Sequence, residues 1–448
     1  MSTSNLLSPR RVHPLWVVVL CWLAVVFDGY DLIVFGVAVP ELLEYKAWNL
    51  NPVLVGQVGS LGLVGMFFGA LASGTLSGRY GPRKLLITSL IVFSLAMPLA
   101  AIAPTLFVFG LCRLVAGLGL GALMPVAIAL TVEFSNPARR QLNNALMFSG
   151  FSVGGILAAV VGLVVLPVAD FRVLFALGAA PLVLVLPFML RFLPESIAFL
   201  KHSGREQQAR ETAARYGIPF AESPASQEKA NPAALFKNRL ATPTLLFWLV
   251  SFCGLLMVYG LNTWLPQIMR SSGYSLGSAL TFLLVFNIGA VVGVIVAGGL
   301  ADKLGEQRVI VVSFLMAAAA VLLLATKPDG FFLYFLIAVA GFGSNTQTLV
   351  NAFVAGFYPA HLRPTGLGWA LGVGRLGAIV GPTYGGIVMS LVAAGAVGNT
   401  WNFYAFVIPS IIAAVLLSLV KKRPLLATPA VPPLGGDEKV DAEKSASA

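Results

Sequence analysis

The chain has 448 residues, of which 58% are hydrophobic and only 10% are charged, with a net charge of +11. Soluble domains usually carry about a quarter of charged residues, so this composition excludes that class. Repeated apolar stretches of about 20 residues predict membrane-spanning helices. They exclude a β-barrel, whose strands alternate apolar and polar positions over about 10 residues.

Twelve apolar stretches follow one another and predict an all-α membrane protein in two six-helix halves. The first six are 15–39, 53–76, 85–103, 105–132, 143–166 and 172–193, and the second six are 243–268, 277–300, 308–326, 330–357, 365–392 and 401–420. We therefore expect an N-terminal half (1–193), a central loop (194–242), a C-terminal half (243–420) and a tail (421–448). The polar central loop should contain an amphipathic helix from Arg205 to Tyr216. The tail is rich in Pro, Ala and charge, which predicts disorder.

Lysine and arginine are distributed unevenly between the two sides of such a bundle. With the N-terminus inside, 23 of the 29 fall in inner segments and four in outer loops, while Arg113 and Arg375 lie within spans. This asymmetry follows the positive-inside rule. It predicts that both termini and the central loop are cytoplasmic, and it explains the basic excess without nucleic acid.

A short segment repeats at the same place in each half. Gly74-Thr-Leu-Ser-Gly-Arg-Tyr-Gly-Pro-Arg-Lys84 follows the second span, and Gly298-Gly-Leu-Ala-Asp-Lys-Leu-Gly-Glu-Gln-Arg308 follows the eighth, at a constant offset of 224 residues. Two parallel six-span halves are the internal symmetry expected of a secondary transporter.

Both copies resemble the loop signature of the major facilitator superfamily, G-x-L-x-D-R-x-G-R-R/K. The second copy retains the acid as Asp302, followed by Lys303 and finally Arg308, whereas the first copy has Gly78 in the acidic position and keeps Arg79. The resemblance implies that the loop helps to lock the cytoplasmic side when the transporter faces outward. The lock of the first half therefore lacks its usual acid.

Another acidic residue could replace the missing one. Glu133 stands at the inner end of the fourth span, near in sequence to neither loop copy. Two outcomes remain open: Glu133 pairs with Arg79 or Arg83 of the first loop, or it is simply solvated.

Further motifs narrow the resemblance. Arg113 to Gly121 is similar to the R-x-x-x-G-x-G-x-G element of the superfamily, and Leu193-Pro-Glu-Ser196 resembles an element of sugar and organic-acid carriers. The glycine-rich region 358–386, Asp28-Gly-Tyr-Asp31 and Trp264-Leu-Pro266 resemble the aromatic acid:proton symporter family. The resemblance implies uptake of benzoate-like or hydroxybenzoate-like anions with protons, with no other cofactor.

Four ionisable residues lie deep inside apolar spans: Asp28, Asp31, Arg113 and Arg375. On membrane-insertion scales, burying these four charges costs ~10–14 kcal/mol in total, so a structural or functional role must account for their presence. Asp28 lies ~20 Å from the inner face at 1.5 Å per residue, a depth that Arg113 can reach from the opposite face. One explanation is a pair of structural Asp–Arg contacts; the other is a transport site.

In the transport interpretation, a guanidinium recognises the substrate carboxylate by a planar two-point match, and an aspartate carries the proton. The two aspartates are three residues apart and so share one helix face. We take Asp31 as first choice for the proton, with Asp28 tuning it or pairing with an arginine. Arg375 is first choice for the substrate carboxylate, and Arg113 is the alternative.

Aromatic and amide side chains in the second half are weaker candidates for binding a phenolic acid, because packing and interhelical hydrogen bonds explain them equally well. They are Tyr259, Asn262, Trp264, Asn287, Asn345 and Gln347.

Enzymatic and metal-dependent functions find no support in the sequence. Gly372 to Gly377 matches G-x-G-x-x-G but lies inside an apolar span, and no G-x-x-x-x-G-K-[ST] loop is present. The histidines and cysteines show no metal-ligand spacing. We expect a monomeric, multi-pass transporter of a bacterial inner membrane. The alternatives are a symporter of another organic anion, such as a dicarboxylate or muconate, and a membrane sensor of aromatic acids.

Overall fold

The computed structural model describes residues 13–136, 139–218, 232–237, 240–344, 346–359 and 362–421, and within them it contains helices and no strands. The first half contains α1 (Leu15–Glu44), α2 (Pro52–Tyr80), α3 (Pro82–Ala101), α4 (Leu106–Glu133), α5 (Arg140–Val165), α6 (Phe171–Ala176), α7 (Ala180–Leu184) and α8 (Leu186–Phe192). The second half contains α11 (Ala241–Ser271), α12 (Leu276–Leu304), α13 (Glu306–Leu324), α14 (Gly330–Ser344), α15 (Gln347–Phe357), α16 (Arg363–Ala393) and α17 (Trp401–Ser418).

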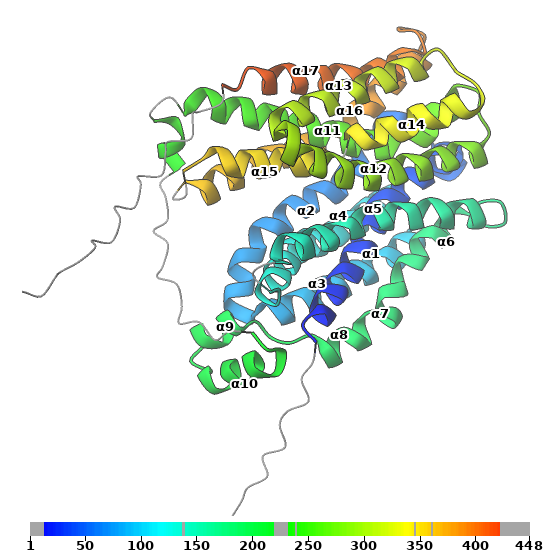
Figure 1. The fold of residues 1–448 in the computed structure, drawn as a ribbon. Coiled ribbons are helices and arrows are strands. Elements are labelled where there is room, and N and C mark those ends of the chain that lie inside the picture. Colours follow the sequence, from blue (N-terminus) through cyan, green and yellow to red (C-terminus); the bar gives the residue numbers. More distant parts are fainter. Residues whose placement is uncertain are drawn as a thin grey trace, which may run out of the picture.

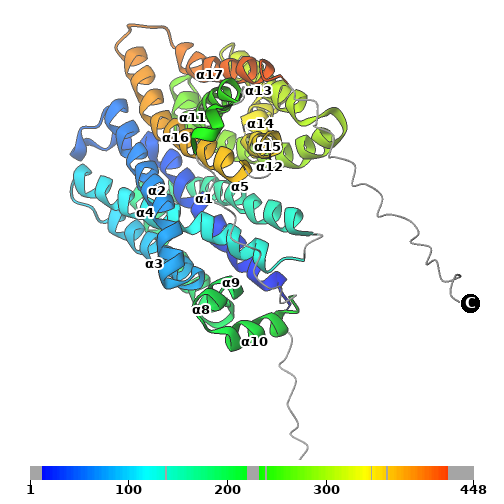
Figure 2. The ribbon, with the colours of Figure 1, turned by 90° about the vertical axis from the view of Figure 1, so that its left-hand side faces the viewer.

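Twelve helical stretches among these residues are long and apolar enough to cross a membrane, which confirms the predicted spans. Figure 1 shows the first half, in blue to teal, below the second half, in green to red, and Figure 2 shows the same division after a quarter turn. An even number of spans puts the start of α1 and the end of α17 at the same end of the bundle, here called the terminal end. The opposite end is called the far end.

Two of the twelve spans are broken helices. The sixth consists of α6, a 3-10 turn at Leu177–Ala179, α7 and α8, and Pro181 and Pro187 stand at the starts of α7 and α8. Proline lacks the N–H that would continue the hydrogen-bond ladder of the preceding helix, so each proline restarts the helix. The tenth span ends one helix at Ser344 and begins the next at Gln347.

The sequence repeat is also a repeat of backbone structure. Gly81 and Gly305 occupy equivalent positions and have φ of 94° and 90°, a conformation that glycine adopts without steric cost. Arg83 donates a hydrogen bond to a carbonyl of α8 at 2.6 Å, and the equivalent Gln307 donates to a carbonyl of α17 at 2.9 Å. Each loop is thus tied to the last span of its own half.

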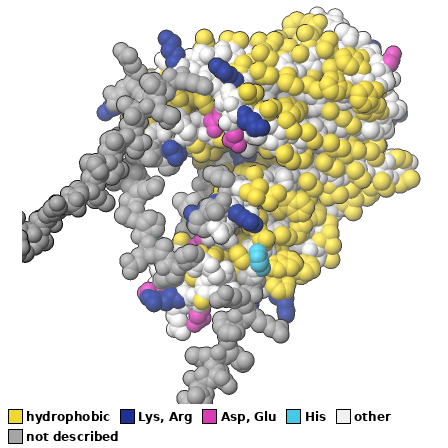
Figure 3. Space-filling model, in the orientation of Figure 1, with side chains coloured by type: hydrophobic (Ala, Val, Ile, Leu, Met, Phe, Trp, Pro, Cys, Tyr) yellow, Lys and Arg dark blue, Asp and Glu magenta, His cyan; other side chains and the backbone are white. Residues whose placement is uncertain are grey.

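Between the halves, the central loop carries α9 (Ile197–His202), α10 (Glu206–Tyr216) and a 3-10 turn at Pro232–Phe236. The predicted amphipathic helix from Arg205 is confirmed as α10, to within one residue. The tail predicted to be disordered lies outside the described residues, except for Lys421. Figure 3 shows apolar side chains over the body of the bundle, while Lys and Arg gather at the end where α9 and α10 lie in Figure 1.

The two halves close against each other toward the far end. The Ser60 hydroxyl of α2 donates to the carbonyl of Ile379 in α16 at 2.6 Å, and Glu44 at the end of α1 forms an ion pair with Arg270 at the end of α11. A Cβ atom on Gly36 of α1 would overlap a backbone carbonyl of α11, so these helices touch through their backbones. Close backbone contact through small residues is the usual way in which membrane helices pack.

The terminal end is less tightly packed. A Cβ atom on Gly366 of α16 would overlap the ring of Tyr358, but at most glycines in this part of α2, α12 and α16 it would meet no described atom within 4 Å; these are Gly74, Gly78, Gly298, Gly299, Gly368 and Gly372. The helix surfaces there have room, in contrast to the glycine contacts near the far end. The structure is therefore a form that is closed at the far end.

The contrast along α2 leads to a matched test of packing. A Cβ atom on Gly65 would overlap the carbonyl oxygen of Leu114 in α4, whereas Gly74 has open space. We expect Gly65→Ala to destabilise the protein by at least ~1–3 kcal/mol, because α2 and α4 must move apart. Gly74→Ala should leave stability within about 0.5 kcal/mol of wild type. Thermal unfolding in detergent, followed by intrinsic fluorescence, measures both; equal midpoints would contradict the packing assignment.

Candidate functional site

A buried ion pair joins α1 to α4. Arg113 Nη1 lies 2.7 Å from Asp31 Oδ1, and both side chains are 2% exposed. The guanidinium also lies over the rings of Phe35 and Phe175, at 5.5 and 5.8 Å from their centroids. The pair confirms that Arg113 lies at the same depth in the bundle as the segment Asp28-Gly-Tyr-Asp31, here called the acidic tetrapeptide. Removing either partner would leave an uncompensated charge, which costs far more than the intact pair contributes.

Glycines let α4 and α1 each pack closely against another helix of the first half. A Cβ atom on Gly117 of α4 would overlap the carbonyl of Gly62 in α2, and one on Gly29 of α1 would overlap the carbonyl of Phe151 in α5. Tyr30 points away from the acids and donates from its hydroxyl to the carbonyl of Leu174 at 2.8 Å. Gly29 and Tyr30 of the acidic tetrapeptide are therefore both packed against other spans of the first half.

Asp28 has a different environment from Asp31. It is 1% exposed, and neither carboxylate oxygen has a hydrogen-bond partner among the described residues. Arg375 of α16 acts on it electrostatically, as it does on Tyr259 of α11, yet Arg375 Nη1 is itself buried and lacks a described partner. The predicted second Asp–Arg contact is thus not formed in this structure. Asp28 and Arg375 come from different halves, and each keeps hydrogen-bonding capacity that no described residue uses.

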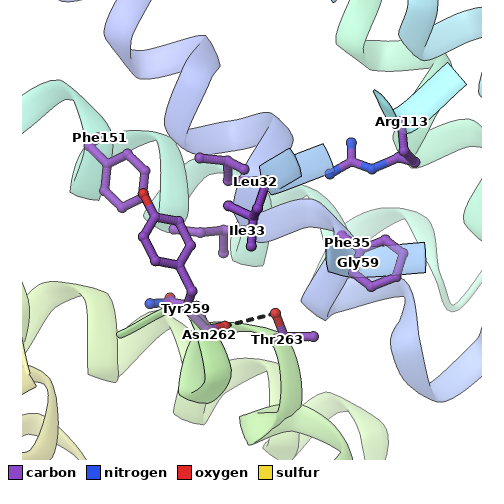
Figure 4. Close-up of a pocket in the computed structure, with 10 residues that line it drawn as sticks. Leu32, Ile33, Phe35, Gly59, Arg113, Phe151, Tyr259, Asn262 and Thr263 are labelled. Carbon is purple, nitrogen blue, oxygen red and sulfur yellow. Dashed lines mark hydrogen bonds between the residues drawn. The ribbon is translucent and has the colours of Figure 1, made fainter. Parts of the chain in front are cut away.

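A pocket lined by Arg113 lies at the boundary between the two halves, here called the seam, and its walls come from α1, α2, α4, α5 and α11 (Figure 4). It is lined by Leu32, Ile33, Phe35, Gly59, Leu63, Arg113, Phe151, Tyr259, Asn262 and Thr263. The rings of Phe151 and Tyr259 meet edge to face across the seam, with centroids 6.4 Å apart. The cavity volume is about 10 Å³, which suits one water molecule. An aromatic ring needs these side chains to separate first.

Two predicted amides meet at the same seam. Asn287 of α12 donates from Nδ2 to Oδ1 of Asn262 in α11 at 3.3 Å. A Cβ atom on Gly155 of α5 would overlap the side-chain oxygen of Asn287, so this residue touches the first half directly. Both amides are buried, and they lie where the halves must part for a substrate to bind.

The other predicted amide and aromatic residues lie outside this pocket. Trp264 is fully buried and donates from its indole N–H to the carbonyl of Pro382 in α16 at 2.7 Å, a contact within the second half. Gln347 donates to Oδ1 of Asn351 at 3.3 Å, and its own oxygen is buried against Gly254. Asn345 falls outside the described residues.

The first repeat loop has an acidic partner that the sequence reasoning missed. Glu195 accepts a hydrogen bond from the backbone N–H of Arg83 at 2.9 Å, and its carboxylate lies against Gly81. Glu133 instead accepts from the backbone N–H of Ala198 in α9 at 2.8 Å, so it pairs with neither arginine of the loop and is not merely solvated. The Leu193-Pro-Glu-Ser196 motif was the signal that could have identified Glu195.

The remaining loop residues lie at the surface of the terminal end. Arg79 is exposed, with its guanidinium 5.5 Å from the ring centroid of Tyr80, and Asp302, Lys303 and Arg308 of the second copy are also exposed. In the described part of the chain, no group of three or more His, Cys, Asp or Glu side chains is placed to hold a metal ion.

Comparisons with known proteins identify the class to which this fold and site belong. The model of the major facilitator superfamily matches residues 21–326 and 282–443. A crystal structure of a D-xylose-proton symporter superposes with a TM-score of 0.74 at 18% identity, over 92% of this chain and 99% of that one. The chain belongs to the major facilitator superfamily.

Within the superfamily, the chain is similar over most of its length to transporters that are named for aromatic acids. It is 34% identical to the benzoate transport protein of Acinetobacter baylyi, over 97% of this chain and 96% of that protein. It is 38% identical to the gentisate transporter of Corynebacterium glutamicum, over 92% and 88%, and 36% identical to the gallate transporter of Pseudomonas putida, over 94% and 95%. The resemblance found in the sequence motifs is confirmed.

The Asp31–Arg113 pair predicts a strongly coupled pair of substitutions. Arg113→Leu should lower the free energy of unfolding by ~3–5 kcal/mol, because Asp31 is left buried without a counter-charge. Adding Asp31→Asn should recover at least half of that loss. Thermal unfolding of the two single variants and the double variant closes the cycle. Additive losses would show that the contact contributes little.

Proposed function

We propose that the protein imports an aromatic carboxylate together with a proton by alternating access between its two halves. The observation that carries the proposal is the set of buried charges Asp28, Asp31 and Arg113, of which Arg113 lines a pocket at the seam. Arg375 of the other half acts electrostatically on Asp28, and the full-length relatives of the chain are named as carriers of aromatic acids. Such a site suits a transporter rather than an enzyme. The proton is the coupling ion, and no other cofactor is required.

The distribution of basic residues supports an orientation with both termini and the central loop in the cytoplasm of a bacterium, and the protein in its inner membrane. In this orientation the far end faces outward, and the structure corresponds to a form closed to the outside. We propose that the protein works as a monomer, because each chain contains both halves that alternating access requires.

The contacts divide the roles among the four charges. Arg375 is the better ligand for the substrate carboxylate, since Arg113 already binds Asp31. Asp28 is the better proton carrier: a buried carboxylate without a partner is costly while ionised, and a proton removes that cost. This ordering exchanges the two aspartates relative to the preference for Asp31 that sequence reasoning favoured. The Asp31–Arg113 pair then holds α1 and α4 together and positions Asp28.

The net charge moved with each substrate determines which gradients can drive its accumulation. One monoanion carried with one proton moves no net charge, so only the pH gradient and the substrate gradient matter. Each additional proton would add ~2.3 kcal/mol per 100 mV of membrane potential.

Uptake by proteoliposomes tests the function. Purified protein should accumulate radiolabelled benzoate or 4-hydroxybenzoate when the lumen is alkaline, with proton influx at the same time, and a protonophore should abolish the accumulation. Binding of these acids without any flux would favour a sensor. Flux of muconate or a dicarboxylate in their place would favour another organic anion as the substrate.

Asp28→Asn should abolish accumulation driven by a pH gradient, because asparagine cannot carry a proton. It should spare exchange of labelled for unlabelled substrate at equal pH on both sides. Asp170→Asn, an exposed aspartate at the start of α6, is the matched control and should accumulate substrate as wild type does. A normal accumulation ratio in Asp28→Asn would remove this residue from proton coupling.

Arg375→Gln should weaken substrate affinity by about 10- to 100-fold, the effect of losing a charge-assisted hydrogen bond of ~1.5–3 kcal/mol. Arg363→Gln, an exposed substitution at the start of the same helix, should leave the affinity unchanged. Concentration dependence of exchange measures both. An unaltered affinity in Arg375→Gln would reassign the carboxylate to Arg113.

A further inference from the structure

An ion pair joins the two halves at the far end. Arg270 Nη2 donates to Glu44 Oε1 at 2.5 Å, between the last turn of α11 and the last residue of α1. The ion pairs of Arg113, Arg172 and Arg210, by contrast, join residues within the first half or within α10. The side chain of Glu44 is 66% exposed and that of Arg270 is 29% exposed. Such a pair is weak, because water solvates both charges when they separate.

This ion pair stands at the outer end of the helix contact that closes the pocket at the seam. Thr263 lines the pocket, and Arg270 follows it by seven residues, close to two turns of α11. Ile33 of α1 also lines the pocket, and Glu44 follows it by eleven residues, close to three turns. At 1.5 Å per residue, the two charges lie on the pocket-facing sides of their helices, about 10 and 16 Å nearer the far end. When the halves part at this end, the route into the pocket opens between them.

The guanidinium of Arg270 has donors left for a second anion. Of its five N–H groups, one donates to Glu44, and the described part of the chain supplies no second acceptor. Glu41, one turn earlier on α1, accepts from the backbone N–H of Phe171 at 3.2 Å and is thus held within the first half. A guanidinium with free donors binds a carboxylate through two parallel hydrogen bonds. The carboxylate of an aromatic acid therefore matches Arg270 better than the single contact from Glu44 does.

Glu44 is placed as a weak competitor for this arginine. It is the last residue of α1, where the unpaired carbonyl groups of a helix end give a partial negative charge that disfavours an anion. Arg270 lies in the last turn of α11, where the same effect favours a cation. Parting of the halves takes Glu44 away with the first half and leaves the cation at the mouth. In the closed form, the carboxylate of Glu44 stands where a substrate carboxylate would bind in the open form.

We propose that Arg270 is an outer capture site for the substrate carboxylate, and that Glu44 occupies this site while the far end is closed. The inference rests on the proposed function, since it assumes an anionic substrate that enters from the far end. A substrate bound to Arg270 excludes the ion pair and so keeps the far end open. Its passage to the pocket frees Arg270, and the ion pair forms again behind it.

Uptake by intact bacterial cells tests the capture site, because an external probe then reaches the protein from the far end. The probe is radiolabelled benzoate or 4-hydroxybenzoate, in a host without uptake of its own. Arg270→Gln should raise the external Km about two- to fivefold, the effect of losing a partly exposed ion pair. Glu44→Gln should lower it about twofold, because the competing carboxylate is gone. Lys327→Gln, which changes an exposed cation between α13 and α14, is the matched control and should leave the Km unchanged.

The opposite signs separate capture from simple closure. If the ion pair only held the far end shut, loss of either partner would favour the open form, and both variants would shift the external Km in the same direction. That result would overturn the inference, as would an unchanged Km in Arg270→Gln. Arg270→Ala replaces this variant if it does not reach the membrane.

Inside-out vesicles provide the control for a general defect. Both variants lose the same ion pair, and neither residue lies at the terminal end, so both should shift the Km for substrate entering from that end by the same factor. A larger shift in Arg270→Gln would mean that the residue affects the whole transporter and would also overturn the inference. If wild-type protein transports neither acid in cells or vesicles, the proposed function itself fails.

Discussion

The burial of Asp28, Asp31 and Arg113 in an apolar bundle, with Arg375 half-buried, is the constraint on which the rest of this structure depends. An arginine in the membrane interior must find a counter-charge or a polar cavity, and Arg113 finds Asp31 at 2.7 Å. That contact requires α1, α2 and α4 to approach one another closely, and glycines at the crossings of α1 with α5 and of α2 with α4 make the approach possible. The positions of the glycines and of the buried charges therefore depend on each other, because the charges can meet only where the helices pack closely.

The same packing separates a rigid part of the site from an adaptable one. Asp31 and Arg113 belong to one half and are bonded to each other, whereas Asp28 and Arg375 come from different halves and keep hydrogen-bonding capacity unused. Groups that face each other across a seam change their surroundings when the halves move, and groups within one half do not. This difference makes the second pair suited to binding and releasing a proton and an anion.

The repeat loops show how two halves of one origin diverge at the terminal end. Gly81 and Gly305 keep the same backbone conformation, and Arg83 and Gln307 keep equivalent contacts to the last span of each half. The first loop lacks the signature acid at Gly78, and Glu195 of the central segment supplies a carboxylate beside it instead. The contact between Glu195 and the first repeat loop thus holds the central segment against the first half, and the loop signature of the superfamily does not indicate this contact.

The sequence alone determined the twelve spans, the repeat at an offset of 224 residues and the depth of the buried charges, because hydropathy and helical rise are local properties of the chain. It also indicated the family, since the motifs are contiguous. Only the tertiary structure decided that Asp31 rather than Asp28 binds Arg113, that Glu195 rather than Glu133 serves the first loop, and that Trp264 bonds to Pro382 away from the pocket. Such choices depend on how each helix is rotated against its neighbours, and residues distant in sequence settle that rotation together.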